Sequence, residues 1–195
     1  MEQDFSIFKI EYNKVEPKRG RVLISEPFLQ DNYFKRSLVL LTEYTPQGAV
    51  GFVLNKSLDV SVNDVIEDFP KFNGAVSIGG PVSTNTIHYL HTLGDLIPNS
   101  ESVIGNIYWG GDFDTVKNMI RENQIQSSQI RFFLGYSGWQ AGQLESELNR
   151  NSWLVSELKP IEIMGYNSNI WKDSLETLGE RYKMWANFPE NPGLN

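Results

Sequence analysis

Continuous apolar runs of strand length dominate the first quarter of the chain. They are "RVLISEPFL" at residues 21–29 and "SLVLLTEY" at residues 37–44. The second run leads through "TPQG", where Pro46 and Gly48 suit a type I turn, into "AVGFVLNK" at residues 49–56. Both arms of this predicted hairpin are continuously apolar, so we expect burial on both faces.

Helical spacing first appears at residues 61–69. Ser61 and Asp64 resemble a capping box, and Pro70 ends the pattern. The apolar stripe of this predicted helix consists of Val62, Val65, Ile66 and Phe69. We therefore expect a short amphipathic helix here.

A second helix is predicted from Asp112, which can cap the first turn. Its inner stripe consists of Phe113, Val116, Met119 and Ile120. Between the two helices, strand patterns occupy residues 75–83, 86–93 and 102–110, and "GGP" at residues 79–81 breaks the first of them. This region is predicted to add three strands.

The stretch "RFFLGYSGWQAGQLESEL", residues 131–148, changes from an apolar strand run to a helical pattern. Ser137 and Gln140 fit a capping box, which predicts a helix that starts near Gly138. The core-facing positions of this helix are Ala141, Leu144 and Leu148. The stretch is thus predicted to be a strand-to-helix join.

The C-terminal third is predicted to contain a strand, "SWLVSEL" at residues 152–158, and then one long helix. The single apolar face of that helix consists of Trp171, Leu175, Leu178, Tyr182 and Trp185. Strands and helices do not alternate regularly, which favours an α+β fold with a mostly antiparallel, barrel-like sheet; a doubly wound sheet is the alternative. We expect one domain over residues 1–195, with an N-terminal extension (1–19) and a C-terminal helix and tail (168–195).

Composition narrows the functional classes. The formal net charge of −7 over 195 residues disfavours nucleic acid as a partner, although one basic cluster comprises Lys18, Arg19 and Arg21, followed by Lys35 and Arg36. The absence of cysteine excludes disulfides, thiolate nucleophiles and cysteine-based zinc sites. The acidic start "MEQDFSIF" is unlike a signal peptide, and the apolar runs are too short to span a bilayer. We therefore predict a cytoplasmic protein.

The glycine-rich stretch at residues 131–148 fits none of the three motifs that it resembles. In a nucleophile elbow a glycine stands two positions after the serine, but Trp139 occupies that place after Ser137. The spacing of Gly135, Gly138 and Gly142 does not match a dinucleotide fingerprint, and no lysine follows them as in a phosphate-binding loop. A generic anion site at the helix start remains an alternative to a purely structural corner.

The two histidines and the paired acids are weak candidates for chemistry. On the predicted strand, His88 and His91 point to opposite faces and lack a third metal ligand. Glu145 and Glu147 are two positions apart on a helix, so they cannot act as a pair and are predicted to lie on a solvated face. "SIGGPV" suits either a backbone ligand site or a tight turn. We expect neither a metal nor a cofactor.

Several blocks together resemble one family of bacterial proteins. "RVLISEPFLQDNYFKRSLVLLTEY", "GAVGFVLNK", "IGGPV" and "RFFLGYSGWQAGQLESEL" followed by "SWLV" are similar, in this order, to the YqgE/AlgH family. The resemblance covers about residues 20–155. It implies an α+β fold with a sheet bent into a pseudo-barrel and a cytoplasmic location. For one branch it implies a role in transcriptional regulation of exopolysaccharide production. It implies no particular reaction or cofactor.

The resemblance also marks a candidate surface for a ligand or a partner. Its residues are Phe34, Arg36, Ser37, Asn55, Gly79, Gly80, Pro81, Gly135, Ser137, Gly138, Trp139, Gln143 and Glu147. The leading hypothesis is a non-enzymatic binding or regulatory protein that acts through a protein or small-molecule partner. The alternatives are an enzyme that uses Ser137 or a histidine–metal site, and direct nucleic-acid binding through the basic cluster.

Overall fold

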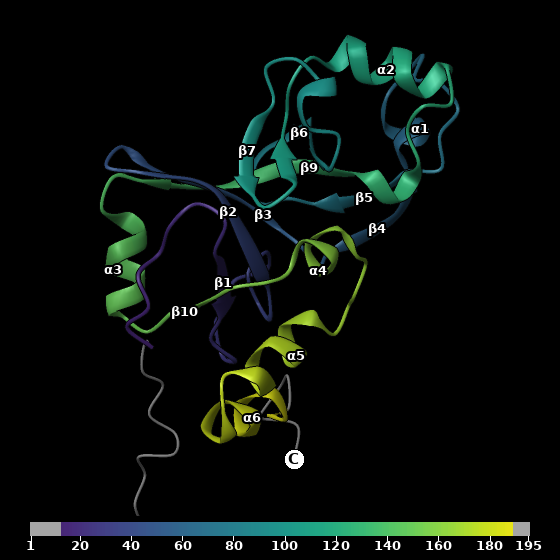
Figure 1. Ribbon diagram of the computed structural model, residues 1–195. Helices are drawn as coiled ribbons and strands as arrows, with labels where there is room; N and C mark the ends of the chain where they lie inside the picture. Colours follow the sequence, from purple (N-terminus) through teal and green to yellow (C-terminus); the bar gives the residue numbers. More distant parts are fainter. Residues whose placement is uncertain (1–12, 189–195) are drawn as a thin grey trace, which may run out of the picture.

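The computed structural model describes residues 13–188, and these residues form an α+β structure (Figure 1). The strands are β1 (Val22–Ser25), β2 (Leu38–Thr45), β3 (Gly48–Val53), β4 (Ser57–Ser61), β5 (Ala75–Ile78), β6 (Val82–His91), β7 (Glu101–Ile104), β8 (Ile107–Trp109), β9 (Ile130–Gln140) and β10 (Trp153–Ser156). The helices are α1 (Val62–Val65), α2 (Phe113–Arg121), α3 (Gln143–Asn149), α4 (Pro160–Met164), α5 (Ile170–Thr177) and α6 (Glu180–Ala186). None of these helices is long and apolar enough to cross a bilayer.

The strands join in one curved sheet with the order β10-β1-β2-β3-β9-β6-β8-β7, to which β5 and β4 are attached beside β9. Neighbouring strands run antiparallel, except that β5 and β9 are parallel. The sheet is not strictly closed, because β10 and β7 each pair with one neighbour along this path. The predicted mostly antiparallel fold is therefore confirmed, and the doubly wound alternative is wrong.

Strand β9 connects the two halves of the sheet. Phe132, in its first half, lies between Val76 of β5 and Tyr89 of β6. Beyond Gly135, which has a φ of 64°, the second half pairs with β3, so that Trp139 lies opposite Ala49. A left-handed residue at this position lets the strand leave β5 and continue along β3, while β6 shifts register and pairs with it again at Val82 and Tyr136.

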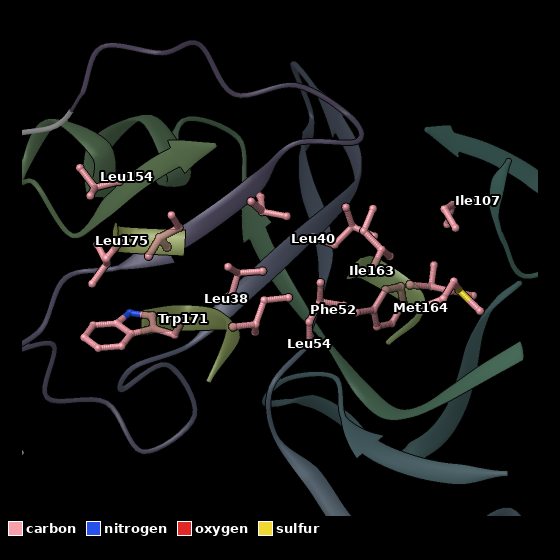
Figure 2. Packing of buried hydrophobic residues seen from close by; sticks show 14 of the residues in the cluster. Leu38, Leu40, Phe52, Leu54, Ile107, Leu154, Ile163, Met164, Trp171 and Leu175 are labelled. Carbon is pink, nitrogen blue, oxygen red and sulfur yellow. The ribbon is translucent and has the colours of Figure 1, made fainter. Parts of the chain in front are cut away.

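Three apolar clusters fill the structure, and each is covered by different helices. One cluster lies under α1 and α2, a second lies under α3, and the third lies under α4, α5 and α6 (Figure 1). In the third cluster, Leu38 and Phe52 of the β2–β3 hairpin pack with Ile163, Trp171 and Leu175 of the C-terminal helices (Figure 2). The neighbouring positions Val39 and Leu41 face the second cluster, so the hairpin is buried on both faces as predicted.

The predicted helix at residues 61–69 is shorter than expected. The capping interaction is present, because the Ser61 N–H donates to the Asp64 carboxylate at 2.8 Å, but α1 ends at Val65. The Asn63 side chain donates to the carbonyl oxygens of Phe69 and Pro70 and accepts from a later backbone N–H. These bonds hold the following segment as a loop, so the apolar spacing is met without a helix.

The predicted helix start near Gly138 is wrong. Strand β9 continues to Gln140, and α3 begins at Gln143 after the left-handed Gly142, which has a φ of 74°. The Gln140 N–H donates to the Gln143 side chain at 3.0 Å, and Ser137 makes no cap. Pairing with β3 satisfies the backbone through this stretch, and it outweighs the local capping signal.

Two further predictions each merged two elements that are separate in the structure. Residues 102–110 form two strands, β7 and β8, because Gly105 takes a left-handed turn conformation with a φ of 57° between them. The single C-terminal helix is two helices, since Gly179, with a φ of 120° and a ψ of 171°, breaks it. Strand β4 was not predicted, because its residues are mostly exposed and lack an apolar run. The end of the predicted C-terminal tail, residues 189–195, lies outside the described residues.

Candidate functional site

The structure places the candidate surface residues in three separate groups. Phe34, Trp139, Gln143 and Glu147 lie around α3. A second group lies where the turn after β5 crosses β9: Gly79, Gly80, Pro81, Gly135, Ser137 and Gly138. The third group, Arg36, Ser37 and Asn55, lies beside the C-terminal helices. Each group has a different physical role.

The first group is a packing cluster closed by one carboxylate. Glu147 accepts hydrogen bonds from the indole N–H groups of Trp139 at 2.9 Å and Trp153 at 2.8 Å, and from the Gln143 amide at 3.0 Å. The Phe34 ring stacks on Trp139 with centroids 6.0 Å apart. The prediction that Glu147 lies on a solvated face is thus wrong, because this carboxylate fastens α3 to the sheet.

The second group is a close crossing of two backbones. A Cβ atom on Gly79 would lie 2.2 Å from the Gly135 carbonyl oxygen, and a Cβ on Gly80 would lie 2.4 Å from the Tyr136 carbonyl. The Ser137 hydroxyl is fully buried and donates to the Gly79 carbonyl at 2.9 Å. These glycines are required for close approach, and Ser137 serves to fasten the crossing.

The two histidines occupy opposite faces of β6, as predicted. His88 contacts the rings of Phe52 and Tyr136, whereas His91 packs against Tyr89 and Tyr108. His91 is fully buried; its Nδ1 accepts from the Leu93 N–H at 3.2 Å, so we assign the Nε2 proton to the bond with the Gly110 carbonyl at 3.0 Å. Burial lowers the pKa of both histidines. His91 is therefore a neutral structural residue.

We expect the buried His91 to make folding sensitive to mild acid. Its pKa is lowered by burial, so the unfolded chain binds the proton more readily. The contribution is fully present above the unfolded pKa of about 6.5 and falls as the pH drops below it, by at most about 1.4 kcal/mol per pH unit. Urea unfolding at several pH values should show that the free energy of unfolding falls less steeply with decreasing pH for His91→Gln than for the wild type. Identical slopes would contradict the assignment.

The third group frames a cavity. The Asn55 amide donates to the Arg36 carbonyl at 2.8 Å, and its oxygen accepts from the Leu38 N–H at 3.0 Å. The Ser37 hydroxyl donates to the Tyr33 carbonyl at 2.8 Å. Asn55 thus holds the loop before β2 in place, with Arg36 in a left-handed conformation at a φ of 49°. This fixed loop carries Lys35 and Arg36, two of the cationic side chains of the site.

We call the cavity beside this loop the basic pocket. It has a volume of about 300 Å³ and is lined by Lys35, Arg36, Asn55, Lys56, Ser168, Asn169, Trp171, Lys172 and Ala186. The Arg36 guanidinium lies over the Trp171 ring, 5.1 Å from its centroid, and donates to the Phe188 carbonyl. The Lys56 ammonium donates to the Lys35 carbonyl at 3.0 Å. Among the residues that the structure describes, four cations and no acid line this pocket.

The sequence indicated Arg36 and Asn55 but missed most of this site. Lys56 is the last residue of the family block "GAVGFVLNK", whereas Ser168, Asn169 and Lys172 come from the start of α5, more than 100 residues away. No local pattern relates these segments. The signal that could have helped is that Lys35, Arg36 and Lys56 all lie within the two blocks on which the resemblance rests.

A larger cavity between α4 and α5, of about 620 Å³, is lined by Glu157, Glu162 and Asp173 among others. Its carboxylates are engaged by the fold. Glu157 pairs with Arg21 at 3.1 Å, Glu162 accepts from the N-cap of α4, and Asp173 accepts from Asn167. No group of three or more residues suited to metal binding occurs within residues 13–188. The basic pocket is therefore the better candidate for ligand recognition.

Comparison with known proteins identifies the family. The AlgH-like family model matches residues 22–183, from the first strand into the last helix. The chain belongs to the AlgH-like family. A UPF0301 protein of Bacteroides thetaiotaomicron is 46% identical over 100% of both chains. A UPF0301 protein of Parabacteroides distasonis is also 46% identical, over 97% of this chain and 98% of its own. The resemblance seen in the sequence blocks is confirmed.

Solved structures show the same fold as this AlgH-like chain. A Corynebacterium diphtheriae protein superposes with a TM-score of 0.75 at 23% identity, over 96% of this chain and 100% of its own. The AlgH protein of Pseudomonas aeruginosa superposes with a TM-score of 0.71 at 24% identity, over 90% and 97%. These likenesses establish the architecture. The ligand must be inferred from the residues of this chain.

Proposed function

We propose that this protein is a non-enzymatic, cytoplasmic binding or regulatory protein whose recognition site is the basic pocket. The observation that carries the proposal is the division of roles among the polar side chains. Ser137 and His91, which could do chemistry, are buried and bonded within the fold. Apart from Trp171 and Ala186, the side chains that line the pocket end in ammonium, guanidinium, amide and hydroxyl groups. Such groups hold a ligand by charge and hydrogen bonds.

Any role in transcription would act through a partner rather than by direct DNA contact. The chain carries a net charge of −7. Two members of the N-terminal basic cluster are in ion pairs, Arg19 with Glu101 at 3.0 Å and Arg21 with Glu157 at 3.1 Å. A mobility-shift titration at low salt, where phosphate contacts are strongest, should show no binding. Tight, salt-dependent binding would overturn this part of the proposal.

A thermal-shift screen of metabolites and nucleotides, combined with pull-downs from a bacterial lysate, tests the proposed function. We expect at least one ligand or partner to be retained by the wild type and lost from the double variant Lys56→Gln/Lys172→Gln. A second double variant, Lys18→Gln/Lys71→Gln, removes two exposed charges that do not line the pocket and should behave like the wild type. The basic pocket would be refuted as the recognition site if every ligand bound both double variants equally, or if the screen and the pull-downs found no ligand and no partner.

The enzyme hypothesis has its own test. A serine-reactive probe should not label the protein, because the Ser137 hydroxyl is buried and donates to a backbone carbonyl. Labelling that Ser137→Ala abolishes would replace the binding proposal with a catalytic one.

A further inference from the structure

A cleft lies where strand β8 ends beside β6. Strand β8 pairs with β6 at Leu90 and His91, and the last link is the Gly110 N–H, which donates to the Tyr89 carbonyl at 3.0 Å. Beyond this bond, at Ile87, β6 has no neighbouring strand on that side. The cleft has a volume of about 440 Å³ and lies between β6, β7, the end of β8 and the start of α2, in the upper part of Figure 1. We call it the aromatic cleft, after Tyr89, Trp109 and Phe113, which line it together with Ile87, Asn99 and Glu101.

The backbone of Ile87 has hydrogen-bonding groups without a partner at this edge. Ile87 lies opposite Leu134 of β9, but the Leu134 carbonyl accepts from the Gly79 N–H on its other side at 2.8 Å. Ile87 and Leu134 are therefore a non-hydrogen-bonded pair, and the Ile87 N–H and carbonyl point away from β9. Tyr89, two positions along the same strand, uses its carbonyl on that side for the bond with Gly110. No such bond from the described residues, 13–188, reaches Ile87, so its polar groups are available to a ligand.

The free edge is too short for a peptide strand. Gly110 occupies it at Tyr89, and in the other direction the register of β6 shifts between Val82 and Ile87. Within that irregular segment, Ser83 has a left-handed φ of 48°. An added strand needs alternating backbone bonds over several residues, whereas one residue offers one donor and one acceptor. This pair suits a compact ligand whose edge carries an acceptor beside a donor.

Aromatic side chains form the walls of the cleft. The half-buried indole of Trp109 meets the Phe52 ring at an interplanar angle of 60°, with centroids 5.9 Å apart. The two rings are not stacked, and the exposed part of the indole belongs to the cleft lining. Phe113 is held in place by the rings of Tyr89 and Phe69, at 5.7 Å and 5.8 Å. Aromatic walls of this kind favour a planar ring system as the ligand.

The polar groups at the rim are neutral or paired. The Asn99 side chain is exposed and makes no hydrogen bond with another residue in the described part of the chain. The Glu101 carboxylate is in an ion pair with Arg19 at 3.0 Å. Burial lowers the pKa of His88, which leaves its imidazole uncharged at neutral pH. A neutral ligand therefore fits this cleft better than an ion.

We propose that the aromatic cleft binds a neutral, planar nitrogen heterocycle of nucleoside size. Its ring lies against Trp109, its edge exchanges hydrogen bonds with the Ile87 N–H and carbonyl, and the Asn99 amide binds its polar periphery. The volume of about 440 Å³ lies within the roughly 300–1,000 Å³ found for small-molecule sites and suits one nucleoside. The cleft shares no lining residue with the basic pocket, so it is a second binding site beyond the proposed function.

The test is titration of the full, isotope-labelled chain with adenosine and with cytidine, followed by amide NMR. We expect saturable shifts of the Ile87 amide and the Trp109 indole resonances. Purine riboside is the matched ligand control, because it keeps the rings of adenosine but lacks the exocyclic amino group that would donate to the Ile87 carbonyl. It should bind about fivefold more weakly than adenosine, which corresponds to the loss of one hydrogen bond.

Variants of the cleft provide the second part of the test. Asn99→Gly removes the rim amide and suits the left-handed φ of 61° at this position, so the fold is retained. We expect it to bind adenosine about fivefold more weakly. Asn123→Gly is its control and should bind like the wild type, since Asn123 is also exposed and left-handed, with a φ of 57°, but does not line the cleft. Trp109→Leu should bind at least about tenfold more weakly, because the base loses its stacking surface.

The assignment would be overturned by shifts that leave Ile87 and Trp109 unmoved, by equal affinity for adenosine and purine riboside, or by full binding in either Asn99→Gly or Trp109→Leu. The absence of saturable shifts with both nucleosides would overturn it as well. Lys56→Gln/Lys172→Gln should bind adenosine like the wild type, because it alters only the basic pocket. Loss of adenosine binding in this double variant would place the nucleoside in the basic pocket instead, whereas failure of nucleoside binding altogether leaves the proposed function standing.

Discussion

Replacing Arg131 with methionine is expected to lower the free energy of unfolding by about 3 kcal/mol or more. The Arg131 side chain is fully buried in β9 and donates to the carbonyl oxygens of Ile163 and Gly165, both at 2.8 Å, and to that of Leu54. Methionine fills much of the volume but leaves two buried carbonyls and one half-buried carbonyl without this donor. Each such loss costs about 1–3 kcal/mol.

The charge of Arg131 acts in the opposite direction. Burial lowers the pKa of this guanidinium to about 10, and its Nε has no hydrogen-bond partner within the described structure. Faces of Phe133 and Tyr166 lie 5.2 Å and 4.6 Å from the guanidinium carbon and offset part of the lost hydration. We expect the loss of these hydrogen bonds to outweigh the gain from removing the buried charge, because one guanidinium joins the segment after β3 to the end of α4 through three bonds.

Arg131→Lys separates the two effects. Lysine retains the charge, but a single ammonium cannot reach acceptors both after β3 and in the α4 region. We therefore expect the free energy of unfolding to fall by at least about 2 kcal/mol. Arg121→Met, on the exposed face of α2, is the matched control and should change stability by less than about 0.5 kcal/mol. Denaturant unfolding of Arg131→Met, Arg131→Lys and Arg121→Met measures these three changes in stability. A methionine variant as stable as the wild type would show that desolvation dominates.

The second large effect is expected for Glu147→Ala, which should lower the free energy of unfolding by about 2–3 kcal/mol. The carboxylate of Glu147 receives two indole N–H groups and one amide, and the Trp153 and Trp139 side chains are 1% and 6% exposed. Alanine leaves these buried donors unpaired and loosens α3 from the sheet. Hydrogen bonds to a charged acceptor each contribute about 1.5–3 kcal/mol, and they do not add fully because the donors share one group.

Glu147→Gln should lower the free energy of unfolding by less, about 1 kcal/mol. The amide oxygen of glutamine can still accept hydrogen bonds from both indoles, although the negative charge is lost. The exposed Glu176→Ala on α5 serves as the control and should leave stability unchanged. Denaturant unfolding followed by tryptophan fluorescence reports both the midpoint and the indole environment. Equal midpoints for Glu147→Ala and Glu176→Ala would show that this cluster contributes nothing to stability.

Local patterns predicted the elements that are stabilised locally or buried along their whole length. The β2–β3 hairpin follows from two apolar runs and a Pro-containing turn, and its two faces enter two different clusters. Helix α2 follows from Asp112, whose carboxylate accepts from the Thr115 N–H at 2.7 Å, and from the apolar stripe that it precedes. In both cases, the residues that decide the structure lie within a few positions of one another.

The errors arose where a distant segment completes the backbone hydrogen bonds. The capping signal at Ser137 was overridden because β3 pairs with β9 there. The helical stripe at residues 171–185 was broken at Gly179, although the apolar residues on both sides still reach the same cluster. Periodicity records which residues are buried, but it does not record whether the backbone between them is continuous.

The sequence by itself determined the fold class, the family and the identity of the blocks at residues 20–155, because apolar period and turn residues act over short distances. Only the tertiary structure decided what those blocks do. It shows Ser137 as a fastening for a glycine crossing, Glu147 as an acceptor for two indoles, and Arg36 as one wall of a basic pocket with Lys172. Residues more than 100 positions apart meet in that pocket because packing of the C-terminal helices on the sheet brings them there.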